Sequence, residues 1–71
     1  MKPLTQRNKT YLSTLVSKRS GLPIDACFDI IDEVVSQITE LQYGNSEYSS
    51  IEQIVIDYLD LPATYSLFFI E

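Results

Sequence analysis

The sequence predicts an all-α fold of three to four short helices, arranged as two helical hairpins. Apolar residues recur at steps of one, three and four along most of the chain, which is the spacing of amphipathic helices. Residues that cap helices flank these apolar runs. The two halves of the chain also repeat one order of elements: a helix, a Leu-Pro turn and a second helix. With 71 residues, the chain is expected to form one small domain with little room for a deep catalytic cleft.

The first helix is predicted over 9–19, after a flexible basic arm formed by residues 1–7. Asn8 belongs to the residue types that cap helix N-termini, so the helix is expected to start behind it. Gly21 suits the left-handed position that follows a helix, and it ends this one. The residues at helical spacing are Tyr11, Leu12, Leu15, Val16 and Arg19.

The second helix is predicted over 23–42 and is the longest periodic segment. Pro23 suits the first helical position, because its missing N–H would be unpaired there. Asp25 places a negative charge at the positive end of the helix dipole. Cys27 lies on the apolar side, so it is expected to pack in the core rather than act as a reactive thiol. The apolar stripe consists of Cys27, Phe28, Ile31, Val34, Val35, Ile38 and Leu41.

A turn over 43–46 separates this helix from a third one. Its start is marked by a capping box, formed either by Ser49 with Glu52 or by Ser50 with Gln53. The apolar face of the third helix consists of Ile51, Ile54, Val55, Tyr58 and Leu59.

The third helix is expected to stop near Asp60, and Pro62 then opens a short apolar segment. This segment is predicted to be a helix of about two turns, although so apolar a run also fits a strand. It completes an internal repeat with a shift of 39 residues. The matching pairs are Leu12 and Ile51, Leu15 and Ile54, Val16 and Val55, Leu22 and Leu61, Pro23 and Pro62, and Ile31 and Ile70.

Composition excludes several classes of protein. The chain has no histidine and one cysteine, which excludes a disulfide framework and a His/Cys zinc site. No apolar run is long enough for a membrane span, and the first twenty residues lack the pattern of a signal peptide. Without a nucleophile–base pair or a cofactor motif, we expect a non-enzymatic protein that needs no cofactor. The free thiol suits the cytoplasm of a cell.

Charge is divided sharply along the chain. All five basic residues lie among the first twenty, and all ten acidic residues follow, for a net charge of −5. Such asymmetry indicates an interaction surface. One interpretation is that the two segments neutralise each other within the fold or across a homodimer. The other is that the acidic surface binds a basic partner.

Nine acidic residues are the candidate partner-binding site. Five of them share one sector of the second predicted helix, opposite its apolar stripe, with a rise of about 5–6 Å over three to four residues. This is comparable to the spacing of charges on a nucleic-acid strand. An ordinary solvated helix face is the alternative, but such faces usually mix both signs of charge. The nine residues are Asp25, Asp29, Asp32, Glu33, Glu40, Glu47, Glu52, Asp57 and Asp60.

The aromatic residues exceed what so small a core needs. They either fill the core with their hydroxyl groups at the surface, or they anchor a homodimer or partner interface, where tyrosine is favoured. These residues are Tyr11, Tyr43, Tyr48, Tyr58, Tyr65, Phe68 and Phe69.

A set of short motifs and apolar positions runs through the first half of the chain: Asn8-Lys9-Thr10, Leu12, Val16, Ser20-Gly21-Leu22, Asp32, Val34 and Ile38-Thr39-Glu40. In these residues the first half resembles the N-terminal helix pair of the HU/IHF family of bacterial nucleoid proteins. The resemblance implies a helical hairpin and a possible dimer, because that pair builds the family's dimer base. After Leu41 the sequence departs from the family, and the sheet and basic DNA-gripping arms are absent, so no DNA-binding residue is carried over.

In size and acidity the chain is also similar to small host-takeover proteins of bacteriophages, some of which are DNA mimics, and to a Bacillus phage inhibitor of HU. This similarity implies an acidic protein that occupies the DNA-binding surface of a basic nucleoid protein such as HU, with its helix carboxylates replacing phosphates. An armless HU/IHF-like protein is the alternative, acting by dimerisation or by direct DNA or structural binding through its basic N-terminus. Little direct nucleic-acid binding is expected from the acidic part, because phosphate affinity comes from Lys and Arg.

Overall fold

The computed structural model describes residues 4–70, and within this range it contains helices and no strand. The helices are α1 (Gln6–Ser20), α2 (Ile24–Gln42), α3 (Ile51–Leu59) and a 3-10 helix, η1 (Ala63–Phe68). The predicted all-α fold is therefore confirmed. The last segment is helical, and its strand alternative is wrong.

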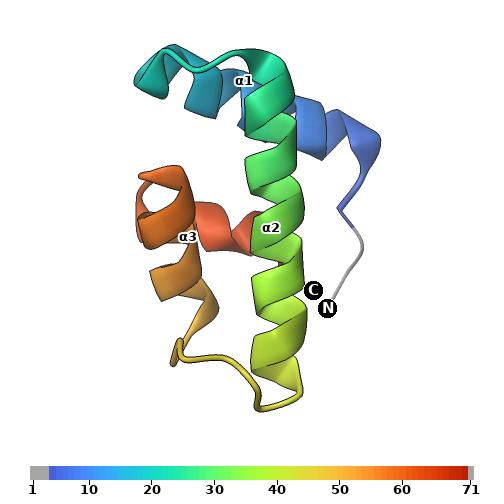
Figure 1. Cartoon of the computed structure of the whole chain (residues 1–71), viewed down its shortest axis with the longest axis vertical. Coiled ribbons are helices and arrows are strands. Elements are labelled where there is room, and N and C mark those ends of the chain that lie inside the picture. Colours follow the sequence, from blue (N-terminus) through green and yellow to red (C-terminus); the bar gives the residue numbers. More distant parts are fainter. Residues whose placement is uncertain (1–3, 71) are drawn as a thin grey trace.

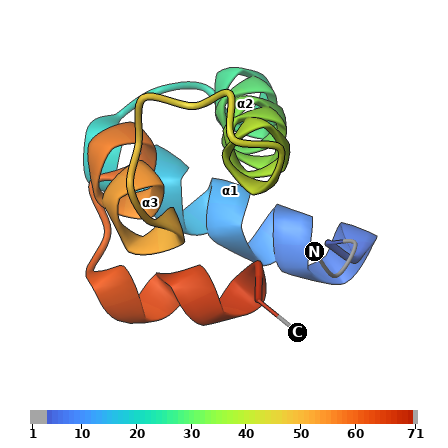
Figure 2. The ribbon, with the colours of Figure 1, turned by 90° about the horizontal axis from the view of Figure 1, so that it is seen from below.

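The helices pack as two consecutive pairs joined through α2 and α3. Helix α1 crosses one end of the long helix α2, and α3 lies beside α2 (Figure 1). In the view from below, η1 lies on the far side of the molecule from α2 (Figure 2), and it packs against α3. The core therefore lies between α1, α2 and α3, and η1 covers it from the remaining side.

Helix α1 begins earlier than the sequence predicts. Thr5 is the N-cap, with extended backbone angles, and its hydroxyl oxygen accepts a hydrogen bond from the Asn8 N–H at 3.1 Å. The prediction of Asn8 as N-cap is wrong, because Thr5 already satisfies that terminus and Asn8 lies in the first turn. Gln6 and Arg7 of the expected arm are helical, and residues 1–3 of the arm lie outside the described residues.

Helix α2 starts one residue later than expected. Pro23 is its N-cap rather than its first helical residue, because its ψ of 147° is extended. At the start of α3, Ser50 is the N-cap, and its hydroxyl oxygen accepts from the Gln53 N–H at 3.2 Å. The capping box is only half formed, because no hydrogen bond joins the Ser50 N–H to the Gln53 side-chain oxygen; the Gln53 side chain lies along α3, where its amide nitrogen donates to Asp57 at 2.9 Å.

The internal repeat is visible in the backbone. Gly21 ends α1 in the left-handed conformation (φ 79°), and Asp60, 39 residues later, ends α3 in the same region (φ 53°). The prolines that follow, Pro23 and Pro62, share nearly the same angles, at φ −59° and ψ 147° and at φ −56° and ψ 151°. Both halves therefore use the same linker geometry between their helices.

The core consists of side chains from α1, α2 and α3, together with Leu61 after α3 and Phe69 after η1. Cys27 is fully buried, as predicted from its place on the apolar stripe. Phe28, Val35 and Leu41 of that stripe are only half-buried. The buried apolar residues are Leu12, Val16, Cys27, Ile31, Val34, Ile38, Ile54, Val55, Leu59, Leu61 and Phe69.

Candidate functional site

All nine predicted partner-binding acids are exposed. Helix α2 carries five of them, and its buried residues Cys27, Ile31, Val34 and Ile38 fix which side faces outward. Because successive residues are rotated by about 100°, the five acids fall within a sector of about 100° on the outer side. We call this surface the α2 acidic face; it is formed by Asp25, Asp29, Asp32, Glu33 and Glu40.

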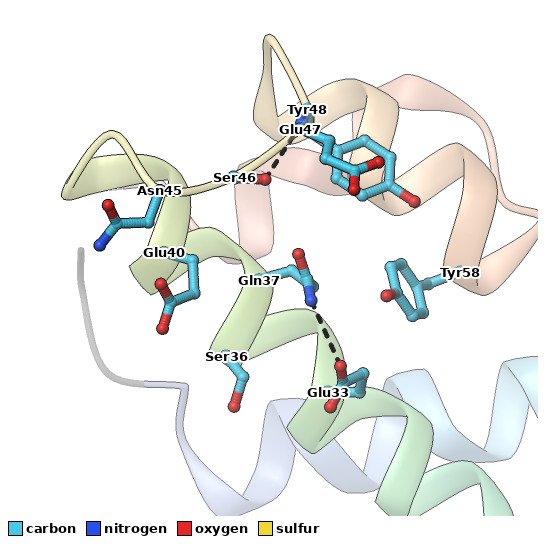
Figure 3. A pocket seen from close by; sticks show the side chains of 9 residues that line it. All are labelled: Glu33, Ser36, Gln37, Glu40, Asn45, Ser46, Glu47, Tyr48 and Tyr58. Atoms are coloured by element: carbon cyan, nitrogen blue, oxygen red, sulfur yellow. Dashed lines mark hydrogen bonds between the residues drawn. The ribbon is translucent and has the colours of Figure 1, made fainter.

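The C-terminal half of α2 borders a groove of about 590 Å³. The groove lies between α2, the 43–50 loop and α3, and its lining side chains are polar or aromatic with no basic residue among them (Figure 3). We call it the acidic groove. Its lining residues are Glu33, Ser36, Gln37, Glu40, Asn45, Ser46, Glu47, Tyr48 and Tyr58.

Three of the nine predicted acids meet at this groove: Glu33, Glu40 and Glu47. Glu33 accepts a hydrogen bond from the Gln37 amide at 3.3 Å, one turn further along α2 (Figure 3). The loop is held by the Ser46 hydroxyl oxygen, which accepts from the Tyr48 N–H at 3.0 Å. The groove therefore presents carboxylates from two elements to one space.

The other predicted acids do not line the groove. Asp25, Asp29 and Asp32 continue the acidic face toward the α1 end of α2, and Asp25 lies about 22 Å along the helix axis from Glu40. Glu52, Asp57 and Asp60 belong to α3 and its C-cap, where none lines the groove. The predicted site is thus one long face on α2, a shared groove, and a separate group on α3.

One acid has a basic partner among residues 4–70. Lys9 of α1 forms an ion pair with Asp32 at 2.6 Å, and its ammonium group lies 5.6 Å from the centre of the Phe28 ring. Arg7, Lys18 and Arg19 are exposed and form no ion pair within that range. Within residues 4–70, the idea that the two charged segments neutralise each other in the fold therefore holds for this single pair.

Tyr48 and Tyr58 form the aromatic wall of the groove, with ring centres 6.1 Å apart. Partial burial raises the pKa of the Tyr48 hydroxyl above its ordinary value of 10.0, and the nearby Asp57 carboxylate raises this pKa further. Tyr48 therefore stays neutral over the physiological range and presents a hydroxyl group rather than another negative charge.

The sequence prediction missed the aromatic and amide residues of the groove. The sequence pattern does not separate Tyr48 and Tyr58 from the other aromatic residues, and it indicates only a turn at Asn45 and Ser46. Their meeting depends on the path of the 43–50 loop, for which the sequence holds no signal beyond turn composition. Of the other tyrosines, Tyr11 and Tyr43 are exposed and Tyr65 is half-buried, so within residues 4–70 no tyrosine is a fully buried core residue.

The described part of the chain offers neither a metal site nor a membrane helix. Within residues 4–70, no three cysteine, aspartate or glutamate side chains are grouped so that they could hold a metal ion. None of the helices in this range has the length and apolar character needed to cross a bilayer.

Comparisons with known proteins give no relative. No protein-family model, no curated protein and no solved structure matches this chain.

Proposed function

We propose that this protein is a non-enzymatic, acidic binding protein that occupies the DNA-binding surface of a basic nucleoid protein such as HU and blocks DNA binding. The observation that carries the proposal is the exposure of all nine candidate acids, of which one, Asp32, is paired within residues 4–70. Unpaired like charges on one surface oppose compactness unless a partner of opposite charge offsets them. A Lys/Arg-rich DNA-binding surface is such a partner.

The α2 acidic face supplies the phosphate-like charges in this proposal. The α2 acidic face extends along the helix for about 22 Å. A binding cleft of the partner that accepts a DNA strand could therefore follow this face along its length. Helix packing holds its backbone in place, which limits the conformational entropy lost on binding. The acidic groove, which Glu33 and Glu40 help to line, adds hydrogen-bond acceptors at one end of the α2 acidic face.

A second mechanism of antagonism is exchange, in which one chain of this protein replaces a chain of the HU dimer and forms a heterodimer without DNA-gripping arms; it is the less favoured mechanism. It requires the apolar sides of α1 and α2 to be available to another chain. In this protein α3 and η1 cover those sides, with Ile54, Val55 and Phe69 fully or almost fully buried in the shared core. Exchange would first have to expose this apolar surface to water, at a cost of about 25 cal/mol per Å². Mimicry needs no such rearrangement.

The test is a competition assay in which the protein displaces a fluorescent DNA duplex from purified HU over a range of salt concentrations. We expect displacement at low salt, a steep loss of displacement as salt rises, and no binding when the protein is mixed with the duplex alone. Displacement that is insensitive to salt would contradict mimicry and favour exchange. Absence of displacement would remove HU as the target, and direct duplex binding would favour the armless HU/IHF-like alternative.

A matched pair of variants locates the binding surface. The first carries Asp29→Asn, Glu33→Gln and Glu40→Gln on α2, and the second carries Glu52→Gln, Asp57→Asn and Asp60→Asn on α3. Both remove three negative charges from exposed positions. The first should lose displacement and the second should retain most of it; equal losses would show that total charge, not the α2 acidic face, controls binding.

A further inference from the structure

We infer that this protein self-associates head to tail, with a basic stripe on α1 of one copy docked antiparallel on the α2 acidic face of the next. The stripe consists of Arg7, Tyr11 and Lys18, which are exposed on the same side of α1. At about 100° per residue they fall within a sector of about 40°. Lys9 lies on the opposite side of the helix, where it pairs with Asp32 of its own chain.

The two surfaces match in spacing as well as in charge. Arg7 and Lys18 are eleven residues apart, and so are Asp29 and Glu40 on α2. Three helical turns separate each pair, or about 16.5 Å. Both charges of the stripe can therefore meet a carboxylate at the same time when the two helices lie side by side.

The antiparallel direction gives the better contact. It places Arg7 opposite Glu40 and Lys18 opposite Asp29, which leaves Tyr11 opposite Ser36. Ser36 is an exposed, small residue on the rim of the acidic groove, so the ring has room beside it. The parallel direction would place Tyr11 opposite a longer, charged Glu33 and align the two helix dipoles unfavourably.

Tyr11 is suited to the centre of such a contact. Half of its surface is exposed, yet its ring is braced by Phe68 of η1, with the ring centres 5.7 Å apart. An aromatic side chain that is already held in place loses little entropy on binding. Exposed Leu67 extends the apolar surface of η1.

A second copy is the occupant that the charges select. The stripe needs an acidic partner with carboxylates about 16.5 Å apart, and the same chain presents them on α2. Two stripes cannot pair with each other, because an antiparallel α1 pair would bring Arg7 of one copy against Lys18 of the other. The contact thus joins two different surfaces, and such contacts extend into open chains unless they close into a ring.

This self-association goes beyond the proposed function and uses the same acidic face. A basic partner bound to α2 would therefore displace the neighbouring copy. The inference is tested on the protein alone, so its failure would leave the proposed antagonism of a nucleoid protein untouched, and the reverse also holds.

Sedimentation equilibrium of the protein at about 20 mM salt provides the test. The mean mass should rise above the 8.1 kDa of one chain as concentration increases, and it should return to that value at about 0.5 M salt. A mass that stays at one chain at low salt would overturn the inference. So would association that survives the higher salt concentration.

Two neutralised variants identify the surfaces. One carries Arg7→Gln and Lys18→Gln, and the other carries Asp29→Asn and Glu40→Gln; each alone should associate about tenfold more weakly. Mixed in equal amounts, they should form a complex of two chains and nothing larger, because one intact stripe meets one intact face. Failure of the mixture to form this complex would refute the proposed pairing.

The controls are Arg19→Gln and Glu52→Gln, which neutralise exposed residues outside both surfaces. They should associate like the unaltered protein, and circular dichroism should show that every variant keeps its helices. Equal weakening in the controls would overturn the assignment to Arg7, Lys18, Asp29 and Glu40. Binding of a short DNA duplex that disappears with Arg7→Gln and Lys18→Gln, in a protein that stays monomeric, would assign the stripe to nucleic acid instead.

Discussion

Replacing Asp60 with glycine should stabilise the protein. Asp60 ends α3 with φ 53° and ψ 38°, in the left-handed region that L-residues other than Asn and Asp rarely enter. The equivalent position of the first half holds Gly21, which adopts the same region without a side chain. The carboxylate of Asp60 also lies at the negative end of the α3 dipole, and no basic residue in the last turn of α3 offsets it.

The expected gain follows from three contributions. The left-handed conformation costs an L-residue about 1–2 kcal/mol, and aspartate is at the lower end of this range. Removing the charge from the helix C-terminus contributes about 0.3 kcal/mol more. Glycine loses about 0.4–1 kcal/mol of this gain, because it makes the unfolded chain more flexible. Asp60→Gly should therefore raise the free energy of unfolding by about 0.3–0.9 kcal/mol and the Tm by about 1–7 °C.

Thermal and urea unfolding followed by circular dichroism would measure the change. Asp60→Asn is the matched control, because it removes the charge and keeps a side chain, so its stability should lie between those of the original protein and Asp60→Gly. Gly21→Ala should lower stability by about 1 kcal/mol through backbone strain, since no atom lies within 4 Å of the added Cβ. If Asp60→Gly were no more stable than Asp60→Asn, the argument from backbone strain would be refuted.

Three further predictions concern the core and the groove. Phe69→Ala should lower the free energy of unfolding, measured by urea titration, by about 3–5 kcal/mol, because Phe69 is 1% exposed. The control Leu67→Ala, at a position that is 70% exposed, should change this free energy by less than about 0.5 kcal/mol. The Ser13 hydroxyl is buried with no hydrogen-bond partner in the described chain, so Ser13→Ala should raise stability by about 1 kcal/mol, and a loss would reveal a partner. Because the pKa of Tyr48 is raised above 10.0 in the fold, the unfolded chain ionises first, so stability should be full below pH 10 and fall as pH rises through the folded pKa. Spectroscopic titration should show the pKa of Tyr48 moving down toward 10.0 in Asp57→Asn. Tyr48→Phe should remove the part of the stability loss at alkaline pH that ionisation of Tyr48 causes. A Tyr48 titration that Asp57→Asn leaves unchanged would contradict the role of the Asp57 carboxylate.

Much of the fold was predictable because its signals are local. The burial of Cys27, Ile31, Val34 and Ile38 follows from their helical spacing, and the end of α1 follows from Gly21. The N-cap of α1 was misplaced because Thr5 and Asn8 are both capping types. Only the contact between Thr5 and the Asn8 N–H decides between them.

The site was predictable in part, for the same reason. The outward position of the α2 acids follows from helix periodicity and the opposite apolar stripe. The meeting of Glu47 and Tyr58 with Glu40 does not, because it depends on how the 43–50 loop returns the chain alongside α2. The ion pair between Lys9 and Asp32 likewise requires the crossing of α1 over α2, which charge patterning along the sequence cannot specify.

The crossing of α1 over one end of the molecule has a consequence for how the protein meets other surfaces. The exposed positive charges of the described chain lie on α1 at that end, while α2 carries negative charges along the rest of the long axis (Figure 1). Such a distribution is a permanent electric dipole. In the field of a positively charged surface, the molecule would rotate before contact so that α2 leads and α1 trails. On an anion-exchange resin it should therefore adsorb in one preferred orientation and leave α1 accessible to a reagent that labels arginine.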